Sequence, residues 1–245
     1  MSFCLFRTRG LVDTIGTTQP SNGLRRSHVA LIVGGLMLAS AGAPSAAFGQ
    51  ADIFEFNGHQ YRLYADSSAR TWADAAAFAA TLSVGGQSGY LARIDSAAEN
   101  TRIVQSILAN QGVLTRTAAD GGGGRYVWIG ANDRAAEGAW RWADGTQFWS
   151  GGPGGSAVGG LYNNWGTNQS GRTEPDNFLF QAAGQDAAGI SVNGWPLGTA
   201  GQWNDIGETN VMPFIVEFNV VPAPGALAPL AVLLVCGRRR RERKS

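Results

Sequence analysis

Two short motifs hold the residues of this chain best suited to bind a metal ion. Glu174-Pro175-Asp176 is the first and Trp203-Asn204-Asp205 is the second. Their carboxylate and amide oxygens are the ligands that calcium prefers, and calcium takes roughly six to eight of them. The motifs therefore predict a calcium site if the fold brings them together. The alternative is that the acids are solvated loop residues and that Asp205 only shapes a turn.

The composition favours one loop-rich domain with an aromatic core. The chain of 245 residues contains 35 glycines and 8 tryptophans, and 15% of its residues are charged. Residues 50–221 carry nine arginines, no lysine and sixteen acidic residues, which gives this segment a formal charge of −7. A negative domain repels phosphate backbones, so we expect no nucleic-acid partner. The same charge suits a divalent cation.

The sequence lacks the features of a disulfide-bonded domain, a zinc site or a known enzyme. Cys4 and Cys236 are the only cysteines, and both lie in the end segments. No disulfide can therefore form within residues 51–221, which must be held by packing. The two histidines, His28 and His59, are isolated, which argues against zinc. No nucleophile elbow, phosphate loop or metal-hydrolase motif is present, so we do not expect an enzyme.

Residues 1–50 have the features of a leader with a secretory signal peptide. Arg25-Arg26 precedes an apolar run at 29–41, and small residues follow at 43–47. A positive region, a short apolar core and small residues are typical of a cleaved export signal. The alternative is a membrane anchor, but the apolar core is short for one. We therefore expect the domain to be exported.

Residues 222–245 combine a proline motif, an apolar run at 227–236 and an arginine cluster. This tail resembles the PEP-CTERM sorting signal of exosortase systems, with Ala223 in place of the usual glutamate. The resemblance implies an exosortase-type partner, transient anchoring at the membrane and then a cell-surface or extracellular location. An ordinary tail anchor is the alternative, although the span is short. The sorting residues would be Pro222, Ala223, Pro224, Arg238, Arg239, Arg240 and Arg241.

The first half of the central domain predicts a hairpin and two helices. Residues 54–64 alternate around the turn Asn57-Gly58, which is typical of a hairpin. Thr71 caps a helix over 72–80, and a short strand is expected at 90–94. Ser96 and Glu99 form a capping box for a second helix that runs to about Asn110. The inward faces would be Trp72, Ala75, Ala76 and Ala79 in the first helix and Ile103, Ile107 and Leu108 in the second.

The second half predicts strands separated by glycine-rich loops. Residues 126–130 are expected to form a buried strand, and Trp140 and Trp142 alternate on a second one. The glycine-rich segment 119–124 lacks the context of a phosphate loop and is interpreted as a flexible connector. Further strands are expected to begin at Trp203 and to close the domain at 213–218.

These motifs, in this order, resemble the C-type lectin-like domain. The resemblance rests on Gly-Tyr-Leu-Ala-Arg-Ile-Asp-Ser-Ala-Ala-Glu-Asn at 89–100, on the segments 128–133 and 137–145, and on the two acidic motifs. It implies an α+β fold over 51–221, with two helices flanking small antiparallel sheets and a long irregular loop region. It also implies a cis peptide bond before Pro175 and calcium whose coordination shell is completed by sugar hydroxyls. The chain would then bind carbohydrate or extracellular polysaccharide.

The candidate site departs from the family pattern in two ways. Its Glu-Pro-Asp sequence is neither the Glu-Pro-Asn of mannose-type sites nor the Gln-Pro-Asp of galactose-type sites. The family's further Glu-Asp step has its best counterpart in Gln185-Asp186, where Gln185 offers a carbonyl oxygen but no charge. Trp165 lies near the loop and could stack on a sugar or pack within the protein. A calcium-independent protein-interaction or matrix module on the same fold is the alternative function.

Overall fold

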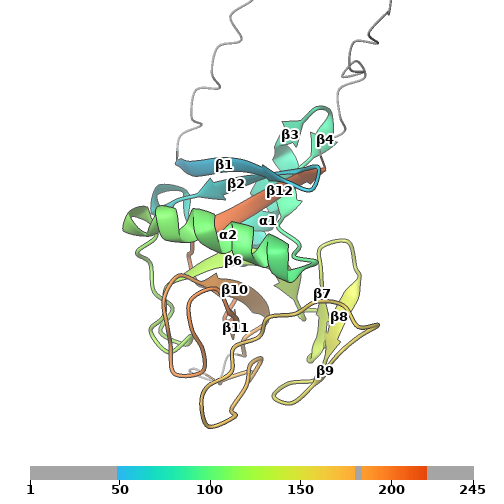
Figure 1. Ribbon diagram of the computed structural model, residues 1–245, viewed down its shortest axis with the longest axis vertical. Coiled ribbons are helices and arrows are strands. Elements are labelled where there is room, and N and C mark those ends of the chain that lie inside the picture. The colour runs from blue at the N-terminus through green and yellow to red at the C-terminus, as the bar shows by residue number, and fades with distance from the viewer. Residues whose placement is uncertain (1–48, 180–183, 220–245) are drawn as a thin grey trace, which may run out of the picture. The chain divides into compact units, whose positions relative to one another are not determined.

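The computed structural model describes residues 49–179 and 184–219, so residues 1–48 of the predicted leader and the whole sorting tail lie outside it. In the described part no helix is long and apolar enough to cross a bilayer. Its helices are α1 (Trp72–Thr81) and α2 (Ala97–Ala109), with 3₁₀ turns at Asp66–Ser68 and Gln111–Val113 (Figure 1). Its strands are β1 (Gln50–Phe56), β2 (His59–Tyr64), β3 (Ser83–Val84), β4 (Gln87–Ser88), β5 (Tyr90–Leu91), β6 (Tyr126–Asn132), β7 (Ala139–Arg141), β8 (Gln147–Ser150), β9 (Ser156–Ala157), β10 (Ala187–Ser191), β11 (Trp203–Ile206) and β12 (Phe214–Asn219).

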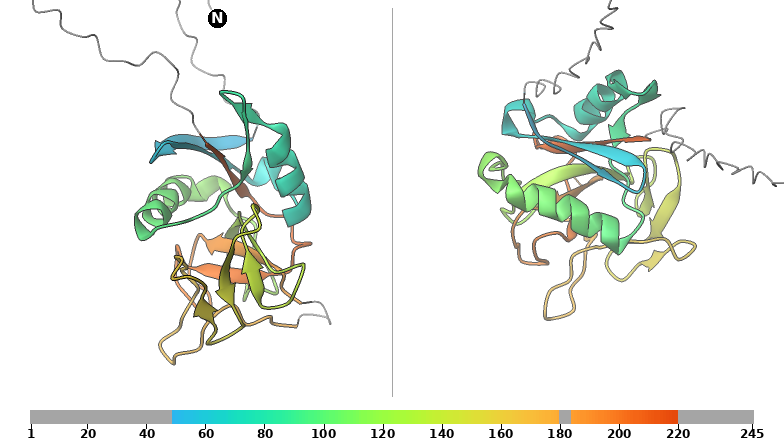
Figure 2. Two further views of the ribbon diagram at one scale, coloured as in Figure 1. Left: turned by 90° about the vertical axis from the view of Figure 1, so that its right-hand side faces the viewer. Right: turned by 45° about the horizontal axis from the view of Figure 1, so that its top comes forward.

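One mixed sheet organises the domain. Its main path runs β1-β2-β12-β6-β7-β8-β9, and β10 joins it by pairing with both β6 and β11. The pairing of β12 with β6 is parallel, and the other strand pairs are antiparallel. The two helices lie on opposite sides of β12 (Figure 2). The predicted α+β architecture with two helices is confirmed, and β11 lies at the end of the sheet where the long loop returns.

The predicted first half of the domain is confirmed with two corrections. Asn57 and Gly58 both have positive φ, at 48° and 81°, as a tight turn between β1 and β2 requires. Leu108 was expected to face inward but is 40% exposed, because Ile103 and Ile107 already define the buried stripe of α2. Glu99 was expected to bond the backbone of Ser96. It instead accepts the Asp95 N–H at 2.8 Å.

The tryptophans of the motifs build the core. Trp140, Trp142 and Trp203 are almost completely buried, and Trp203 contacts Trp142 edge to face at 5.7 Å between ring centroids. Buried indoles need a partner for their N–H group, and Trp203 donates to the Asn100 Oδ1 atom at 2.9 Å. This bond ties β11 to α2. The core therefore fixes the strand that carries the second acidic motif.

Gly130 allows β6 to pass directly over β5. Its N–H donates to the carbonyl of Ala92 at 2.8 Å. A Cβ atom at this position would collide with the carbonyl oxygen of Leu91 and lie 3.2 Å from that of Ala92. Both obstacles are backbone atoms, so no side chain can move aside to make room.

We expect Gly130→Ala to lower the free energy of unfolding by about 2 kcal/mol or more, as overpacking does. Denaturant unfolding of the purified protein measures this. The matched control is Gly112→Ala, because a Cβ atom at Gly112 meets nothing within 4 Å. An equal loss of stability in both variants would show that the close approach of β6 to β5 is not the cause.

Candidate metal and ligand site

The long loop before β10 is held against β11 by backbone hydrogen bonds. Trp165 and Trp203 form a parallel bridge, in which the Trp203 N–H donates to the carbonyl of Asn164 at 2.8 Å. The Gly166 N–H donates to the carbonyl of Trp203 at 2.8 Å, and the Glu174 N–H donates to that of Gly166 at 2.9 Å. This ladder brings the two acidic motifs side by side.

Three carboxylates meet where the loop crosses β11. Glu174, Asp176 and Asp205 each offer an oxygen, and these oxygens lie within 4.8 Å of one another. The Glu174–Pro175 bond is cis, as the resemblance implied. The Asp205 carboxylate accepts the backbone N–H of Asp176 at 3.1 Å and that of Asn177 at 2.8 Å. Asp205 therefore fixes the loop that carries the other two acids.

Two buried oxygens at this point have no hydrogen-bond partner. They are Oε2 of Glu174 and Oδ1 of Asn204, in side chains that are each only 2% exposed. The other end of each side chain is held in place. The Trp195 indole donates to Oε1 of Glu174 at 2.9 Å, and Nδ2 of Asn204 donates to the Tyr126 hydroxyl at 2.9 Å. Buried polar atoms are almost always satisfied, so these two oxygens are free to accept a bond from a ligand or a water molecule.

Burial and mutual repulsion make the carboxylates hard to ionise without a cation. Burial is the largest cause that raises the pKa of Glu174 well above its ordinary value, and the charge of Asp205 adds to it. Burial likewise raises the pKa of Asp205, although the N–H groups of Asn177 and Asp176 act against it. A bound divalent cation would favour the charged form of both groups.

The cluster opens into a hollow of about 400 Å³. Glu174, Asp176 and Asn204 form part of its lining, together with the loop 119–122 and the segment 195–197. The loop was interpreted as a plain connector, but it is a wall of this hollow. The Tyr126 hydroxyl donates to the carbonyl of Gly121 at 2.6 Å, and Asp120 accepts the Gly207 N–H at 2.8 Å. These bonds hold the wall at a fixed distance from β11.

Comparison with known proteins decides the family. Residues 68–215, more than half of the chain, match the Lectin C-type domain family. The chain belongs to the C-type lectin domain family. This is a family of binding domains and not of enzymes, its members often bind calcium, and they are typically extracellular or on the cell surface.

Individual relatives are distant. The chain is 29% identical over 164 residues to the alpha-N-acetylgalactosamine-specific lectin of Patiria pectinifera, covering 67% of this chain and 76% of that protein. It is also 29% identical over 127 residues to Halomucin of Haloquadratum walsbyi, covering 50% of this chain but only 1% of that protein.

Solved structures of other C-type lectins are similar as well. The crystal structure of the C-type lectin CEL-I from Cucumaria echinata has a TM-score of 0.47 and 23% identity, covering 69% of this chain and 96% of that one. The mouse scavenger receptor C-type lectin carbohydrate-recognition domain has a TM-score of 0.43 and 25% identity, covering 70% and 97%.

Gln185 lines the hollow of this C-type lectin domain, but its carbonyl oxygen is already engaged. Oε1 accepts the Phe178 N–H at 2.6 Å, and Nε2 donates to the carbonyl of Asp120 at 2.9 Å. The side chain is 1% exposed and joins the long loop to the glycine-rich wall. Gln185 thus shapes the site, and it could act as a ligand only by sharing this oxygen.

Asp186 belongs to a second acidic group, which the sequence reasoning missed. Burial is the largest cause that raises the pKa of Asp133 to about 7 and that raises the pKa of Glu137, and the charge of Asp186 adds to both shifts. Asp186 lies outside the cluster around Asp205. Nδ2 of Asn177 donates to Oε2 of Glu137 at 2.7 Å, which links this group to the long loop. Asp133, which lies in the segment 128–133 that resembles the family, was the one residue in the sequence that could have pointed to this second acidic group.

Trp165 does not face a ligand. It is only 6% exposed, and its ring packs against Trp140 at 4.8 Å and Trp203 at 5.9 Å between centroids. A buried ring has no free face for a sugar, so we leave Trp165 out of the site. Two aromatic side chains line the hollow instead. Trp195 is half-buried and meets Tyr126 edge to face at 5.8 Å, and Phe178 is exposed.

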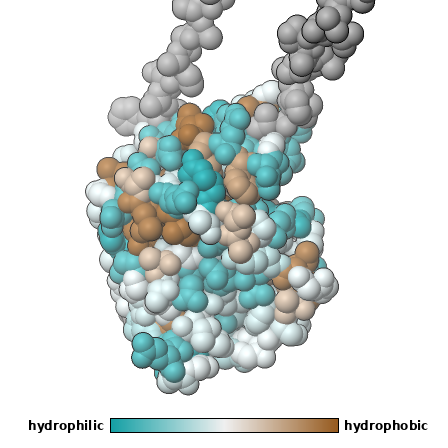
Figure 3. Space-filling model, viewed as in Figure 1, coloured by the Kyte–Doolittle hydropathy of each residue, from teal (hydrophilic) through white to brown (hydrophobic). Residues whose placement is uncertain are grey.

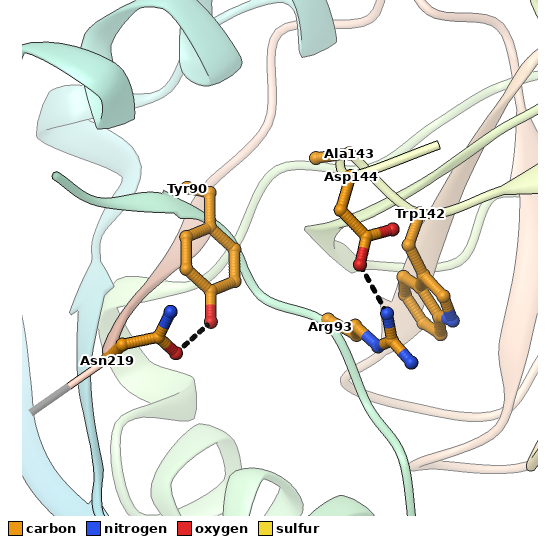
Figure 4. Close-up of a pocket in the computed structure, with 6 residues that line it drawn as sticks. All are labelled: Tyr90, Arg93, Trp142, Ala143, Asp144 and Asn219. Carbon is orange, nitrogen blue, oxygen red and sulfur yellow. Dashed lines mark hydrogen bonds and ion pairs between the residues drawn. The ribbon is translucent and has the colours of Figure 1, made fainter. Parts of the chain in front are cut away.

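A separate hollow of about 340 Å³ is less suited to bind a charged ligand (Figure 4). Arg93 points to Asp144 on one side of it, and Arg93 also pairs with Asp95 at 2.8 Å. Tyr90 donates to Oδ1 of Asn219 at 2.9 Å on the other side. Its charges are therefore mutually neutralised, and none of the predicted site residues lies there.

Proposed function

We propose that this domain binds carbohydrate through a calcium ion held by Glu174, Asp176, Asn204 and Asp205. The observation that carries the proposal is the pair of unpartnered buried oxygens, one on Glu174 and one on Asn204, beside three converging carboxylates. All four side chains offer the hard oxygen atoms that calcium prefers. The cluster lacks the nitrogen and sulfur ligands typical of zinc.

The residues fit the ion in charge as well as in chemistry. Three carboxylates supply a charge of −3, which a divalent cation reduces to −1. Asp205 is held by two backbone N–H groups and Glu174 by the Trp195 indole, so the ligands are oriented before an ion arrives. Calcium held there would supply open coordination positions for neighbouring sugar hydroxyls. The lined hollow is where such a sugar would lie.

The class of ligand follows from the family, and the particular sugar does not. The Patiria pectinifera relative is named for α-N-acetylgalactosamine, but only 29% of the aligned residues are identical. We therefore extend to this chain the binding of a carbohydrate and leave its specificity open. The part of the surface seen in Figure 3 is mostly hydrophilic or neutral over the long loop, with the hydrophobic residues gathered farther up.

Export is part of the proposal. The leader 1–50 and the tail 222–245 have the sequence features of a signal peptide and of a PEP-CTERM sorting signal, and all but the last two residues of this leader and the whole tail lie outside the described residues. A domain that uses calcium to bind extracellular polysaccharide would meet both ligands outside the cell. Detection of the chain by surface labelling before and after removal of residues 222–245 tests this part.

A glycan array tests the binding itself. We expect the purified protein to bind a subset of glycans in the presence of calcium. This binding should be lost when calcium is removed with a chelator, and it should be absent in the Glu174→Gln variant. Glu55→Gln is the control, because Glu55 is an exposed residue of β1 outside the site. Glycan binding that persists equally in chelator, or protein partners captured without calcium, would favour the alternative interaction module and contradict the proposal.

A further inference from the structure

Arg172 is presented to the hollow by a tight turn. Thr167 and Thr173 pair across this turn, and the Asn168 N–H donates to the carbonyl of Arg172 at 3.0 Å. The Oδ1 atom of Asn168 accepts the Arg172 N–H at 3.0 Å, and its Nδ2 donates to the carbonyl of Pro196 at 3.3 Å. The turn is therefore fixed to the opposite wall of the hollow.

The guanidinium of Arg172 has no ion-pair or hydrogen-bond partner within the described residues. The side chain is exposed and lines the hollow together with Glu174 and Asp176. Among the residues that line this hollow it is the single cationic one, and no carboxylate in the described part of the chain lies within ion-pair distance of it. Of the other arginines among the described residues, all except the exposed Arg116 have a side-chain hydrogen bond, an ion pair or an aromatic contact.

Arg172 also lies where two hollows meet. Arg172 and Asp176 line the hollow of about 400 Å³ and a second one of about 340 Å³ beside it. Of the three clustered carboxylates, Asp176 therefore borders both hollows together with Arg172. Glu174 lies two residues beyond Arg172, and both residues line the larger hollow. The cation is thus placed beside the proposed calcium ligands.

We propose that this site selects glycans that carry a carboxylate, and that the Arg172 guanidinium binds that carboxylate. The inference rests on the proposed function. A guanidinium matches a carboxylate with two parallel hydrogen bonds, which is both strong and directional. The domain as a whole has a formal charge of −7 between residues 50 and 221. Such a field repels polyanions, so an acidic sugar would depend on the local charges of calcium and Arg172.

Matched sugars and matched variants test the proposal. The purified protein in calcium would be titrated with methyl glucoside and methyl glucuronide, and with the corresponding galactose pair. We expect the uronide of one pair to bind about tenfold or more tightly than its neutral partner, as a charge-assisted hydrogen bond allows. Arg172→Gln should remove this preference, so that each uronide binds within about twofold of its neutral partner. Arg116→Gln is the control.

The conservative variant and the sulfated sugar separate shape from charge. Arg172→Lys keeps the charge but not the planar fork, so it should retain only part of the preference. Equal gains with a sulfated hexoside would show that charge alone is recognised and would overturn the assignment of a carboxylate.

The remaining outcomes distinguish this inference from the proposed function. If neutral sugars bind in calcium but uronides bind no more tightly, the inference is overturned and the proposed function stands. The same holds if the Arg172→Gln variant keeps the wild-type preference for uronides. If neither class of sugar binds in calcium, the proposed function fails and the inference fails with it.

Discussion

Asp205→Asn is expected to weaken calcium binding by about a hundredfold or more. The substitution removes one of three converging charges and replaces an accepting oxygen by an NH₂ group. The Asp205 carboxylate accepts two backbone N–H groups, from Asp176 and Asn177, and asparagine can accept only through its single oxygen. The variant would therefore lose a ligand and also loosen the loop that carries Asp176. A calorimetric titration with calcium measures the loss.

The stability of the same variant without calcium separates ligand loss from misfolding. In chelator we expect the free energy of unfolding to change by less than about 2 kcal/mol, because the lost hydrogen bond is offset by the removal of a buried charge. In saturating calcium the wild type should gain about 2.7 kcal/mol at a hundred times its Kd, and the variant should gain almost nothing. Asp74→Asn, at an exposed position on α1, is the control. Calcium stabilisation that survives Asp205→Asn would place the ion elsewhere.

Calcium should stabilise the protein more as the pH rises. The pKa values of Glu174 and Asp205 are raised in the calcium-free protein, mainly by burial, so the folded protein holds protons that the unfolded chain has released. The stability of the calcium-free protein therefore falls as the pH rises from the ordinary carboxylate pKa through the raised one. Calcium must displace these protons, so its affinity should rise by up to about tenfold for each pH unit and proton released.

Thermal unfolding with and without calcium, between about pH 5 and pH 8, measures this dependence. This range brackets the pKa of Asp205, which burial raises to about 7. The difference between the two curves should widen toward pH 8. Burial also raises the pKa of Glu217, but none of the neighbours that shift this pKa belongs to the site. We therefore expect Glu217 to affect both samples alike and to cancel in the difference. Asp205→Asn should flatten the difference. A gap of constant width across the range would show that no proton is exchanged for calcium.

The fold could be predicted wherever a short-range signal is tied to a local geometry. Asn57-Gly58 predicted a turn because both residues tolerate positive φ, and Thr71 predicted a helix start because its hydroxyl accepts the Asp74 N–H. Leu108 was placed wrongly, since a residue next to the buried stripe can turn outward without disturbing the helix. The pairing of β10 with both β6 and β11 has no local signal, because it depends on contacts between distant segments.

The site could be predicted only in part for the same reason. The three clustered acids were found from their motifs, and so was Asn204. The sequence could not show that the oxygen of Gln185 is bonded to the Phe178 N–H, or that Asp186 lies with Asp133 instead of Asp205. Both the hydrogen bond of Gln185 and the position of Asp186 depend on how the long loop folds back on itself. The number of residues between two motifs does not determine the path of the loop between them.

The wall formed by the glycine-rich loop was missed because its support is remote in sequence. Asp120 accepts the Gly207 N–H and the side-chain amide of Asn210, which holds the loop over β11. Glycine-rich composition predicts freedom of the unfolded chain, but it does not exclude order once hydrogen bonds from other segments fix the backbone. The sequence therefore indicated the side of the hollow that carries the acidic motifs, but not the side formed by residues 119–122.

A calcium titration of the purified protein by calorimetry, beside Glu174→Gln, tests the central claim most directly. The account predicts saturable binding to the wild type, a rise in melting temperature on binding, and loss of both in the variant, whose unpartnered buried oxygen would have become a neutral amide group. Absence of binding heat together with an unchanged melting temperature in the wild type would contradict the calcium site and the carbohydrate function built on it.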